Sequence, residues 1–340
     1  MKWLLLLIIA ISPQKEKTSV KVVLFGDLMM AGMDTLKAVR NDPLYPFRGT
    51  LSLIREADIA IANLEAPLGT YGDRVEDKEY TFLTNPKLAS YAKAAGFDGF
   101  VLANNHIMDY GTAALRQTIE TLDSLGIKHA GAGMNVGEAR KPMIFKCKGV
   151  KIGVLAYSNT FPKSYWATSK RAGTAFGHVG FIRSDVKRLR DSVDFVIVYF
   201  HWGAERGIQP KGYQRTLAHI AIDAGADLVV GSHPHIVQGI EVYRGRLIFY
   251  SLGNYAFRST TDSASGAALL VKLFPQDSVV YEIVPLKVRY RDVRYSPKVT
   301  HEKGFIERIR ERSSYKFDVD ERGFGRVVLP HRRNRLTTKR

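Results

Sequence analysis

Cysteine and acidic residues are both scarce in this chain of 340 residues. Cys147 is the single cysteine, which excludes an intrachain disulfide and a thiolate metal cage. Any bound metal would therefore need His, Asp, Glu or Asn as ligands. The 33 Asp and Glu residues face 50 Lys and Arg residues, giving a formal net charge of +17. This excess favours an anionic partner, such as a nucleic acid, a membrane surface or an acidic polymer.

Several familiar sequence signals are also missing. The absence of a Gly-x4-Gly-Lys-Ser/Thr loop excludes a P-loop nucleotide site, and no serine nucleophile elbow is present. Aromatic and basic residues are not interleaved as in single-strand nucleic-acid binders, so we expect no specific nucleic-acid partner. No repeat and no Gly/Ser-rich or Pro-rich linker occurs. The sequence therefore predicts one elaborated domain.

Long apolar runs are limited to one, at Trp3–Ile11 directly after Lys2. At about 1.5 Å per residue, this run is too short for a helix to cross a hydrocarbon core of about 30 Å. A basic start, a short apolar run and small residues are typical of a secretory signal peptide. We expect residues 1–19 to be a signal peptide or a short membrane anchor, which places the protein outside the cytoplasm or in the cell envelope. A first buried strand is the alternative.

From Val22 onward, continuous apolar runs alternate with amphipathic stretches. Such runs are typical of strands that are covered on both faces. Their alternation with helices predicts a layered α/β fold with much of the sheet parallel. The expected strands are Val22–Phe25, Ile59–Ala62, Phe100–Ala103, Ile152–Tyr157, Phe195–Phe200, Leu228–Val230 and Leu247–Tyr250. The expected helices are 85–96, 112–125 and 212–224.

The pattern changes after Tyr255. Ala267–Phe274 and Val279–Val284 read as an antiparallel pair of strands, and Val288–Tyr295 alternates as a half-exposed strand does. Residues 331–340 contain five basic side chains and no acidic one. We interpret this last segment as a disordered basic tail.

Polar side chains follow five of the apolar runs. Because ligands of α/β sheets bind outside the carboxyl ends of the strands, we expect these side chains to converge on one crevice. They are Asp27; Asn63 and Glu65; Asn105 and His106; His201 and Glu205; His233 and His235.

The residue types at these strand ends predict a metal site. Each signal alone is weak, because a Gly-Asp pair is usually a turn and a single histidine is usually structural. The pair His233 and His235 is stronger, since on an extended segment it can point two imidazoles at neighbouring sites. Buried carboxylates and imidazoles need a compensating cation. A pair of divalent metals with nitrogen and oxygen ligands supplies one.

The ordered motifs GD, NLE, ANNH, HWG-E, GSHPH and SLGNY span Val20 to Tyr255. As a set, they resemble the capsule-synthesis CapA (poly-γ-glutamate biosynthesis) family, whose fold is that of the calcineurin-like metallophosphoesterases. The resemblance implies an α/β fold with a layered β-sandwich flanked by helices. We expect this domain over residues 20–274 and a β-rich antiparallel extension over 275–330.

The same resemblance implies roles for individual residues around two divalent ions (Mn, Zn or Fe). Asp27 and His235 would bind the first metal, Glu65 would bridge, and Asn105, His201 and His233 would bind the second. His106 would be the leaving-group acid or an oxyanion stabiliser. Asn63, Glu205 and Asn254 would contact the substrate or support the ligands.

The first strand departs from the phosphoesterase pattern, which usually reads Asp-x-His. Here Asp27 is followed by Leu28 and Met29, so the first metal site lacks one imidazole. This departure is shared by the CapA pattern and favours that family over a general phosphoesterase.

Three functions remain open from the sequence. The first is an exported CapA-like protein in the biosynthesis, export or anchoring of an anionic envelope polymer, with a metal-dependent hydrolase-like site and membrane-bound polymer synthase components as partners. The second is a general metallophosphoesterase acting on nucleotides, phospholipids or nucleic acid. The third is a non-catalytic polymer-binding module.

Overall fold

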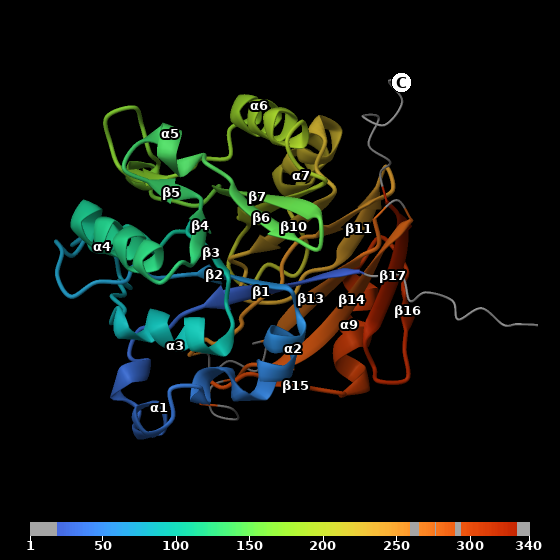
Figure 1. The fold of residues 1–340 in the computed structure, drawn as a ribbon, viewed down its shortest axis with the longest axis horizontal. Coiled ribbons are helices and arrows are strands. Elements are labelled where there is room, and N and C mark those ends of the chain that lie inside the picture. The colour runs from blue at the N-terminus through green and yellow to red at the C-terminus, as the bar shows by residue number, and fades with distance from the viewer. Residues whose placement is uncertain (1–18, 259–264, 276, 290–293, 332–340) are drawn as a thin grey trace, which may run out of the picture.

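The computed structural model describes residues 19–258, 265–275, 277–289 and 294–331 (Figure 1). The predicted export signal or anchor and the predicted basic tail lie outside these ranges, apart from Ser19 and His331. In the described part of the chain, no helix is long and apolar enough to span a membrane. Two β-sheets lie in the middle of the molecule, with helices on their outer sides (Figure 1).

Nine strands of the described chain form the first sheet, in the order β16-β17-β14-β13-β1-β2-β3-β4 with β15 paired to β14. The strands β1 to β4 are parallel neighbours. On the other side of β1 the sheet continues with β13, antiparallel to β1, and then with β14, antiparallel to β13. The bounds are β1 (Val20–Leu28), β2 (Ile59–Leu64), β3 (Gly99–Val101), β4 (Lys128–Ala130), β13 (Gly266–Leu273), β14 (Ser278–Lys287), β15 (Lys298–Val299), β16 (Asp318–Val319) and β17 (Gly325–Pro330).

The second sheet has six described strands in the order β11-β12-β10-β9-β7-β6. Its four middle strands, β12, β10, β9 and β7, run parallel. The bounds are β6 (Met143–Cys147), β7 (Val150–Ser158), β9 (Phe195–His201), β10 (Leu228–Ser232), β11 (Ile240–Tyr243) and β12 (Arg246–Phe249). A separate pair consists of β5 (Ala132–Gly133) and β8 (Gly173–Thr174).

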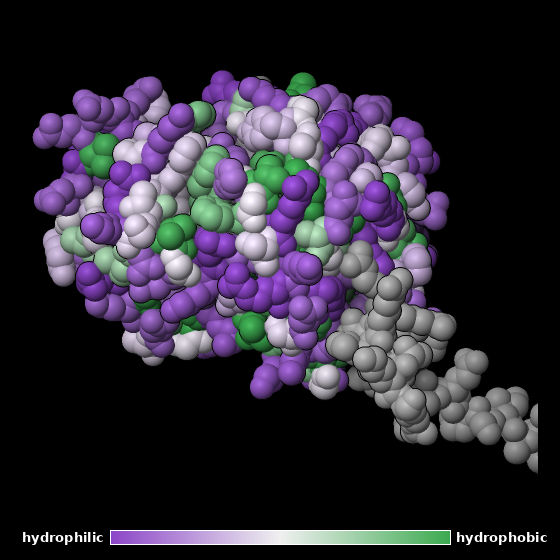
Figure 2. Space-filling model, turned by 90° about the horizontal axis from the view of Figure 1, so that it is seen from above, coloured by the Kyte–Doolittle hydropathy of each residue, from purple (hydrophilic) through white to green (hydrophobic). Residues whose placement is uncertain are grey.

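Helices cover the outer face of each sheet. The first sheet is covered by α1 (Lys37–Asn41), α2 (Leu51–Glu56), α3 (Lys87–Ala95) and α4 (Gly111–Ser124). The second is covered by α5 (Val136–Ala139), α6 (Val179–Arg190) and α7 (Gly212–Ala224). The helix α9 (Lys303–Arg312) buries its apolar face in the core between the sheets, and η1 (Met33–Thr35), η2 (Tyr45–Thr50) and η3 (Lys163–Tyr165) are short 3-10 turns. Figure 2 shows the molecule from above with hydrophobic residues in small patches among hydrophilic ones.

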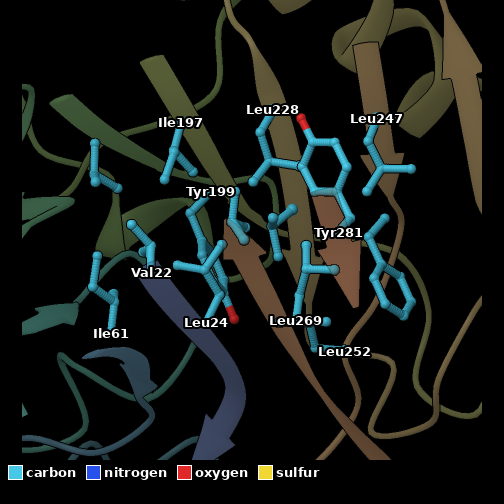
Figure 3. Close-up of a cluster of buried hydrophobic side chains, with 14 of the residues drawn as sticks. Val22, Leu24, Ile61, Ile197, Tyr199, Leu228, Leu247, Leu252, Leu269 and Tyr281 are labelled. Carbon is cyan, nitrogen blue, oxygen red and sulfur yellow. The ribbon is translucent and has the colours of Figure 1, made fainter. Parts of the chain in front are cut away.

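The main core lies between the two sheets (Figure 3). Side chains alternate across a strand, so Val22 and Leu24 of β1 point into this core while Val23 and Phe25 pack under the helices. From the second sheet, β9 sends Ile197 and Tyr199 into the same core. Burying one such aliphatic side chain contributes about 1.5–3 kcal/mol relative to leaving it exposed. The continuous apolar runs in the sequence follow from this two-sided burial.

The seven predicted strands and three predicted helices are present within a few residues of their expected bounds. The mixed α/β fold, with a layered sandwich flanked by helices, is therefore confirmed. The antiparallel pair after Tyr255 is also present as β13 and β14. These strands belong to the same sheet as β1, but the predicted boundary between domain and extension at residue 274 stays a prediction.

The strand predicted over Val288–Tyr295 is wrong for the residues that are described. The preceding strand, β14, ends at Lys287, and Arg294 and Tyr295 lie in a turn with positive φ angles of 44° and 68°. A left-handed backbone cannot continue a β-strand. Val288 and Tyr295 are nevertheless buried, in the apolar cluster between the first sheet and its helices. Residues 290–293 lie outside the described residues.

Candidate metal centre

The carboxyl ends of parallel strands from both sheets meet at one edge of the sandwich. The first sheet supplies Asp27 from β1 and Glu65 from the end of β2. The second supplies His201 from β9 and His233 directly after β10. Asp27, Glu65 and His201 are completely buried, and His233 is 8% exposed. The predicted convergence of strand ends is therefore present, and it places two carboxylates among imidazoles inside the protein.

The Asp27 carboxylate is held by side chains from three directions. Oδ1 accepts a hydrogen bond from Asn63 Nδ2 at 2.8 Å, and Oδ2 accepts one from the His233 backbone N–H at 3.2 Å. His235 Nδ1 lies 3.3 Å from Oδ2. Burial alone would raise the pKa of Asp27, but the contact with His235 and the nearby His201 together lower it well below its usual range. This aspartate is ionised.

The backbone at the end of β1 packs closely against the loop that follows β12. A Cβ atom at Gly26 would lie 1.9 Å from the Gly253 carbonyl oxygen, so only glycine fits there. This approach lets Asp27 N–H donate to Gly253 O at 3.0 Å and Tyr255 N–H donate to Asp27 O at 2.8 Å. Asn254 is thereby placed beside the site, with its Oδ1 atom 2.8 Å from His235 Nδ1.

Glu65 differs from Asp27 in having no hydrogen-bond partner for its carboxylate among the described residues. Both carboxylate oxygens are buried without a hydrogen bond to any described residue. Oε1 lies 3.4 Å from His201 Nε2 and 3.8 Å from His235 Nε2, contacts that lack hydrogen-bond geometry. Burial, followed by the charge of Asp27, raises the pKa of Glu65 to about 8. A buried carboxyl group without a partner costs folding free energy, which marks the position as one that a cation would stabilise.

Three imidazoles surround these carboxylates. Burial lowers the pKa of His201 to about 3, and burial together with the neighbouring imidazoles lowers that of His233, so both rings are neutral and can act as metal ligands. Burial would also lower the pKa of His235, but the charges of Glu65 and Asp27 raise it to about 10. The Nδ1 atom of His233 is buried without a hydrogen-bond partner among the described residues.

The segment from His233 to His235 is not extended, contrary to the sequence prediction. Both histidines have positive φ angles, 97° and 58°, which non-glycine residues rarely adopt. Such strained backbone is found mainly at functional sites. The turn places the two ring centroids 5.9 Å apart and allows both imidazoles to face the carboxylates. The prediction that they reach neighbouring positions therefore agrees with the structure, although the backbone does so differently.

The arrangement of these groups fits divalent metal ions. Ligand atoms lie within 4.8 Å of one another in three sets: Asp27, Glu65 and His235; Glu65, His201 and His233; Glu205, His233 and His235. Glu65, His233 and His235 each belong to two sets, and Glu65 is the one carboxylate among these three, with two oxygens that could bridge two ions. The Asn105 amide oxygen lies 2.8 Å from His201 Nε2 and so sits beside the second set. The unpartnered atoms of Glu65 and His233 are the ones that a cation would satisfy.

His106 is oriented by two residues that the sequence analysis missed. Its Nδ1 atom lies 2.7 Å from Asp109 Oδ2, and Lys78 Nζ lies 2.6 Å from the other oxygen of this carboxylate. Lys78 also donates to the Asn105 carbonyl oxygen, and Tyr165 OH lies 3.3 Å from Asp109. The i,i+3 spacing of His106 and Asp109 was a usable signal in the sequence. Lys78 lies in an irregular loop between β2 and α3 and gave none.

Asn104 is a second omission, although it stands within the ANNH motif. Its amide nitrogen donates to Asn63 Oδ1 at 3.1 Å and to the Leu64 carbonyl oxygen at 2.8 Å. Its Oδ1 atom accepts from the backbone N–H groups of His106 and Ile107. Asn104 thus ties the end of β2 to the turn that carries His106. Asn63 is likewise a supporting residue that fixes the Asp27 carboxylate.

A cavity of about 680 Å³ opens beside these groups. His106, Glu205, His235 and Asn254 line it, and Phe82 packs edge-on to the His106 ring with 4.8 Å between centroids. The cavity has the size of a small-molecule site or of a segment of a larger ligand. It brings the predicted acid His106, the predicted metal ligand His235 and the predicted substrate residues Glu205 and Asn254 to one accessible space.

The fold and this pocket define an α/β sandwich with a carboxylate and histidine centre at its strand ends. Residues 21–259 match a family described as bacterial capsule synthesis protein PGA_cap. The chain belongs to this family, and the resemblance proposed from the motifs is confirmed.

Two curated relatives agree with this assignment. The capsule biosynthesis protein CapA of Bacillus anthracis is 28% identical over 290 residues, which cover 82% of this chain and 71% of that protein. The PGA biosynthesis protein CapA of Bacillus subtilis (strain 168) is 30% identical over 267 residues, covering 77% and 70%.

Solved structures with a similar fold include the NAD nucleotidase of Haemophilus influenzae, with a TM-score of 0.48 and 13% identity over 80% of this chain and 50% of that one. Another is the calcineurin-like phosphoesterase YfkN of Bacillus subtilis, with a TM-score of 0.42 and 13% identity over 92% and 90%. At TM-scores below 0.5, neither likeness carries residue roles or activity to this chain.

Proposed function

We propose that this protein acts in the cell envelope, in the synthesis, export or anchoring of an anionic polymer of the poly-γ-glutamate type. In this proposal the pocket is a divalent-metal hydrolytic site. The names of the CapA relatives support the polymer, and the net charge of +17 suits a polyanion. The pair of unpartnered oxygens on buried Glu65 is the observation that carries the metal site.

Each residue of the pocket has a role in this proposal. Asp27 and His235 would hold one ion, His201, His233 and Asn105 would hold the other, and Glu65 would be shared between them. Ions bound there would polarise a phosphoryl or carbonyl group and activate water. His106 stands at the cavity with Nδ1 directed to Asp109, which leaves its second ring nitrogen for the leaving group. A proton held on that nitrogen can be given to the departing oxygen or nitrogen.

Metal analysis of the purified protein tests the central claim. We expect about two equivalents of a divalent transition metal in the wild type, and stepwise loss in Asp27→Ala and His233→Ala. His219→Ala is the matched control, because His219 is a half-buried histidine that pairs with Glu241 at 2.7 Å, outside the pocket. Wild-type protein that binds no divalent metal would contradict the proposal. Metal binding without turnover of a phosphodiester or of the polymer would indicate that the protein is a binding module and not a hydrolase.

A further inference from the structure

A second cavity, of about 500 Å³, lies next to the metal cavity. Two residues, Arg206 and Ile236, line both spaces. Arg206 follows Glu205 on the loop after β9, and Ile236 follows His235. The second cavity therefore begins where the metal pocket ends, and a ligand can occupy both.

Five basic side chains line this second cavity, which we call the basic groove, together with apolar and neutral polar residues. It is bordered by Arg206, Lys287, Arg289, Arg308 and Arg312. Glu302 is the one acidic residue among its described lining residues, and it lies 3.4 Å from Lys287 Nζ. These residues come from the β9 loop, the end of β14 and α9, so tertiary packing brings them together. The groove keeps an excess of positive charge.

Arg308 and Arg312 of α9 lie near each other in the groove, and the free energy that this proximity of two positive charges costs would be offset by a bound anion. Arg308 and Arg312 are four residues apart and therefore share one face of the helix. Arg312 is half-buried and donates to the Val237 carbonyl oxygen at 2.6 Å. Burial, followed by the charge of Arg308, lowers the pKa of Arg312, while the charge of Glu311 opposes this shift. In the described chain, Arg206 and Arg308 form no ion pair with a carboxylate.

We propose that the basic groove binds successive carboxylates of a polycarboxylate chain and leads that chain past Arg206 into the metal cavity. The inference rests on the proposed function, because it assigns the substrate path of the same site. Guanidinium groups match carboxylates through paired hydrogen bonds, and four of the five basic residues are arginines. Successive charges along the groove would suit a polymer with one carboxylate per repeat.

Binding of a fluorescent glutamate decamer, linked through its γ-carboxyl groups, tests this path by anisotropy on the purified metal-loaded protein. We expect Arg308→Glu to raise the Kd roughly tenfold or more, since a charge-assisted hydrogen bond is lost and a repulsive charge is added. Arg206→Gln should weaken binding in the same direction. The matched control is Arg183→Glu, an exposed arginine on α6, which should stay within about twofold of the wild type.

Two outcomes would contradict the proposal that the basic groove binds a polycarboxylate chain. One is equal binding by the wild type, Arg308→Glu and Arg206→Gln. The other is a polyphosphate of the same charge competing more strongly than the glutamate decamer, which would assign the groove to a different polymer.

The same assay separates the groove from the metal site. Repeating the titrations after chelation should preserve the difference between Arg308→Glu and Arg183→Glu. If the wild type holds no metal yet shows this difference, the hydrolytic proposal fails and the groove stands. If metal binds normally and the difference is absent, the groove fails and the metal centre stands.

Discussion

Two glutamates, each beside a histidine, have opposite surroundings in this molecule. Glu241 on β11 accepts hydrogen bonds from Arg215 Nη1 at 3.0 Å, His219 Nε2 at 2.7 Å and Tyr250 OH at 2.7 Å. Partial burial would raise its pKa, but these bonds together lower it. Glu65 is fully buried and has no hydrogen bond to any described residue, and its pKa is raised to about 8.

This contrast distinguishes Glu241, whose carboxylate is stabilised by hydrogen bonds within the fold, from Glu65, whose carboxylate has none among the described residues. The partners of Glu241 come from α7 and from Tyr250, directly after β12, and they stabilise the fold without any further group. The contacts of Glu65 are other potential metal ligands, so the chain alone leaves the cluster unbalanced. Buried groups of the second kind are characteristic of functional sites, where stability is reduced in favour of activity.

Glu65→Gln should produce the largest difference between the two regions. We expect the affinity for divalent metal to fall more than about a hundredfold, because a charged ligand shared by two ligand sets is lost. Glu241→Gln should leave the affinity unchanged. Isothermal titration with Mn²⁺ or Zn²⁺ measures both. Equal metal affinity in wild type and Glu65→Gln would remove the distinction drawn between the two residues.

Replacement of His106 is expected to separate chemistry from metal binding. His106→Ala should lower turnover of an aryl phosphodiester by about 10²- to 10⁴-fold, the usual contribution of a general acid, with metal content at the wild-type level. The measurements are kcat with a chromogenic diester and metal analysis of the same sample. Full activity in this variant would assign His106 a structural role like that of His219.

Asp109→Asn should give an intermediate effect, because Asp109 orients His106 rather than contacting the substrate. We expect a decrease in kcat of about 10- to 100-fold. A decrease in stability with kcat at the wild-type level would show that Asp109 only supports the loop.

Glu241→Gln should produce the smallest effect, confined to stability. Loss of the charge-assisted bonds should cost about 1–2 kcal/mol at pH 7. Because folding lowers the pKa of Glu241 below its ordinary value of 4.5, its contribution is present above about pH 4.5 and is lost as the pH falls further. Urea unfolding at pH 7 and pH 3.5 should therefore show a larger difference from wild type at the higher pH. An equal difference at both pH values would contradict this account.

The sequence predicted the strands and the polar side chains at their ends, because both depend on the local order of residues along the chain. Strands such as Phe195–His201 are continuously apolar since both faces are buried, and a polar group at the next position marks the strand end. The parallel arrangement then brings Asp27, Glu65 and His201 together. These regularities also carried the family resemblance.

Other features depend on packing that the sequence does not encode locally. Lys78 reaches Asp109 from an irregular loop, and the turn at His233 takes a backbone conformation that proline and histidine do not predict. The basic groove joins Arg206 of the loop after β9, Lys287 of β14 and Arg308 of α9, three separate elements. Net charge indicated an anionic partner, but only the three-dimensional arrangement gives it a location.

The candidate metal centre also combines chain segments that lie far apart in the sequence and are therefore synthesised at different times. The Asp27 carboxylate accepts a hydrogen bond from the backbone N–H of His233, 206 residues later in the sequence. The strand β1 also pairs with β13, with Val20 opposite Leu273. Contacts of such long sequence separation are slow to form, because the entropy lost on closing the intervening chain must be offset first. A chain that ends before β10 lacks His233 and His235, the two imidazoles that lie beside Asp27. In the proposed function, the metal site is therefore complete only after β10 and the turn that follows it have folded.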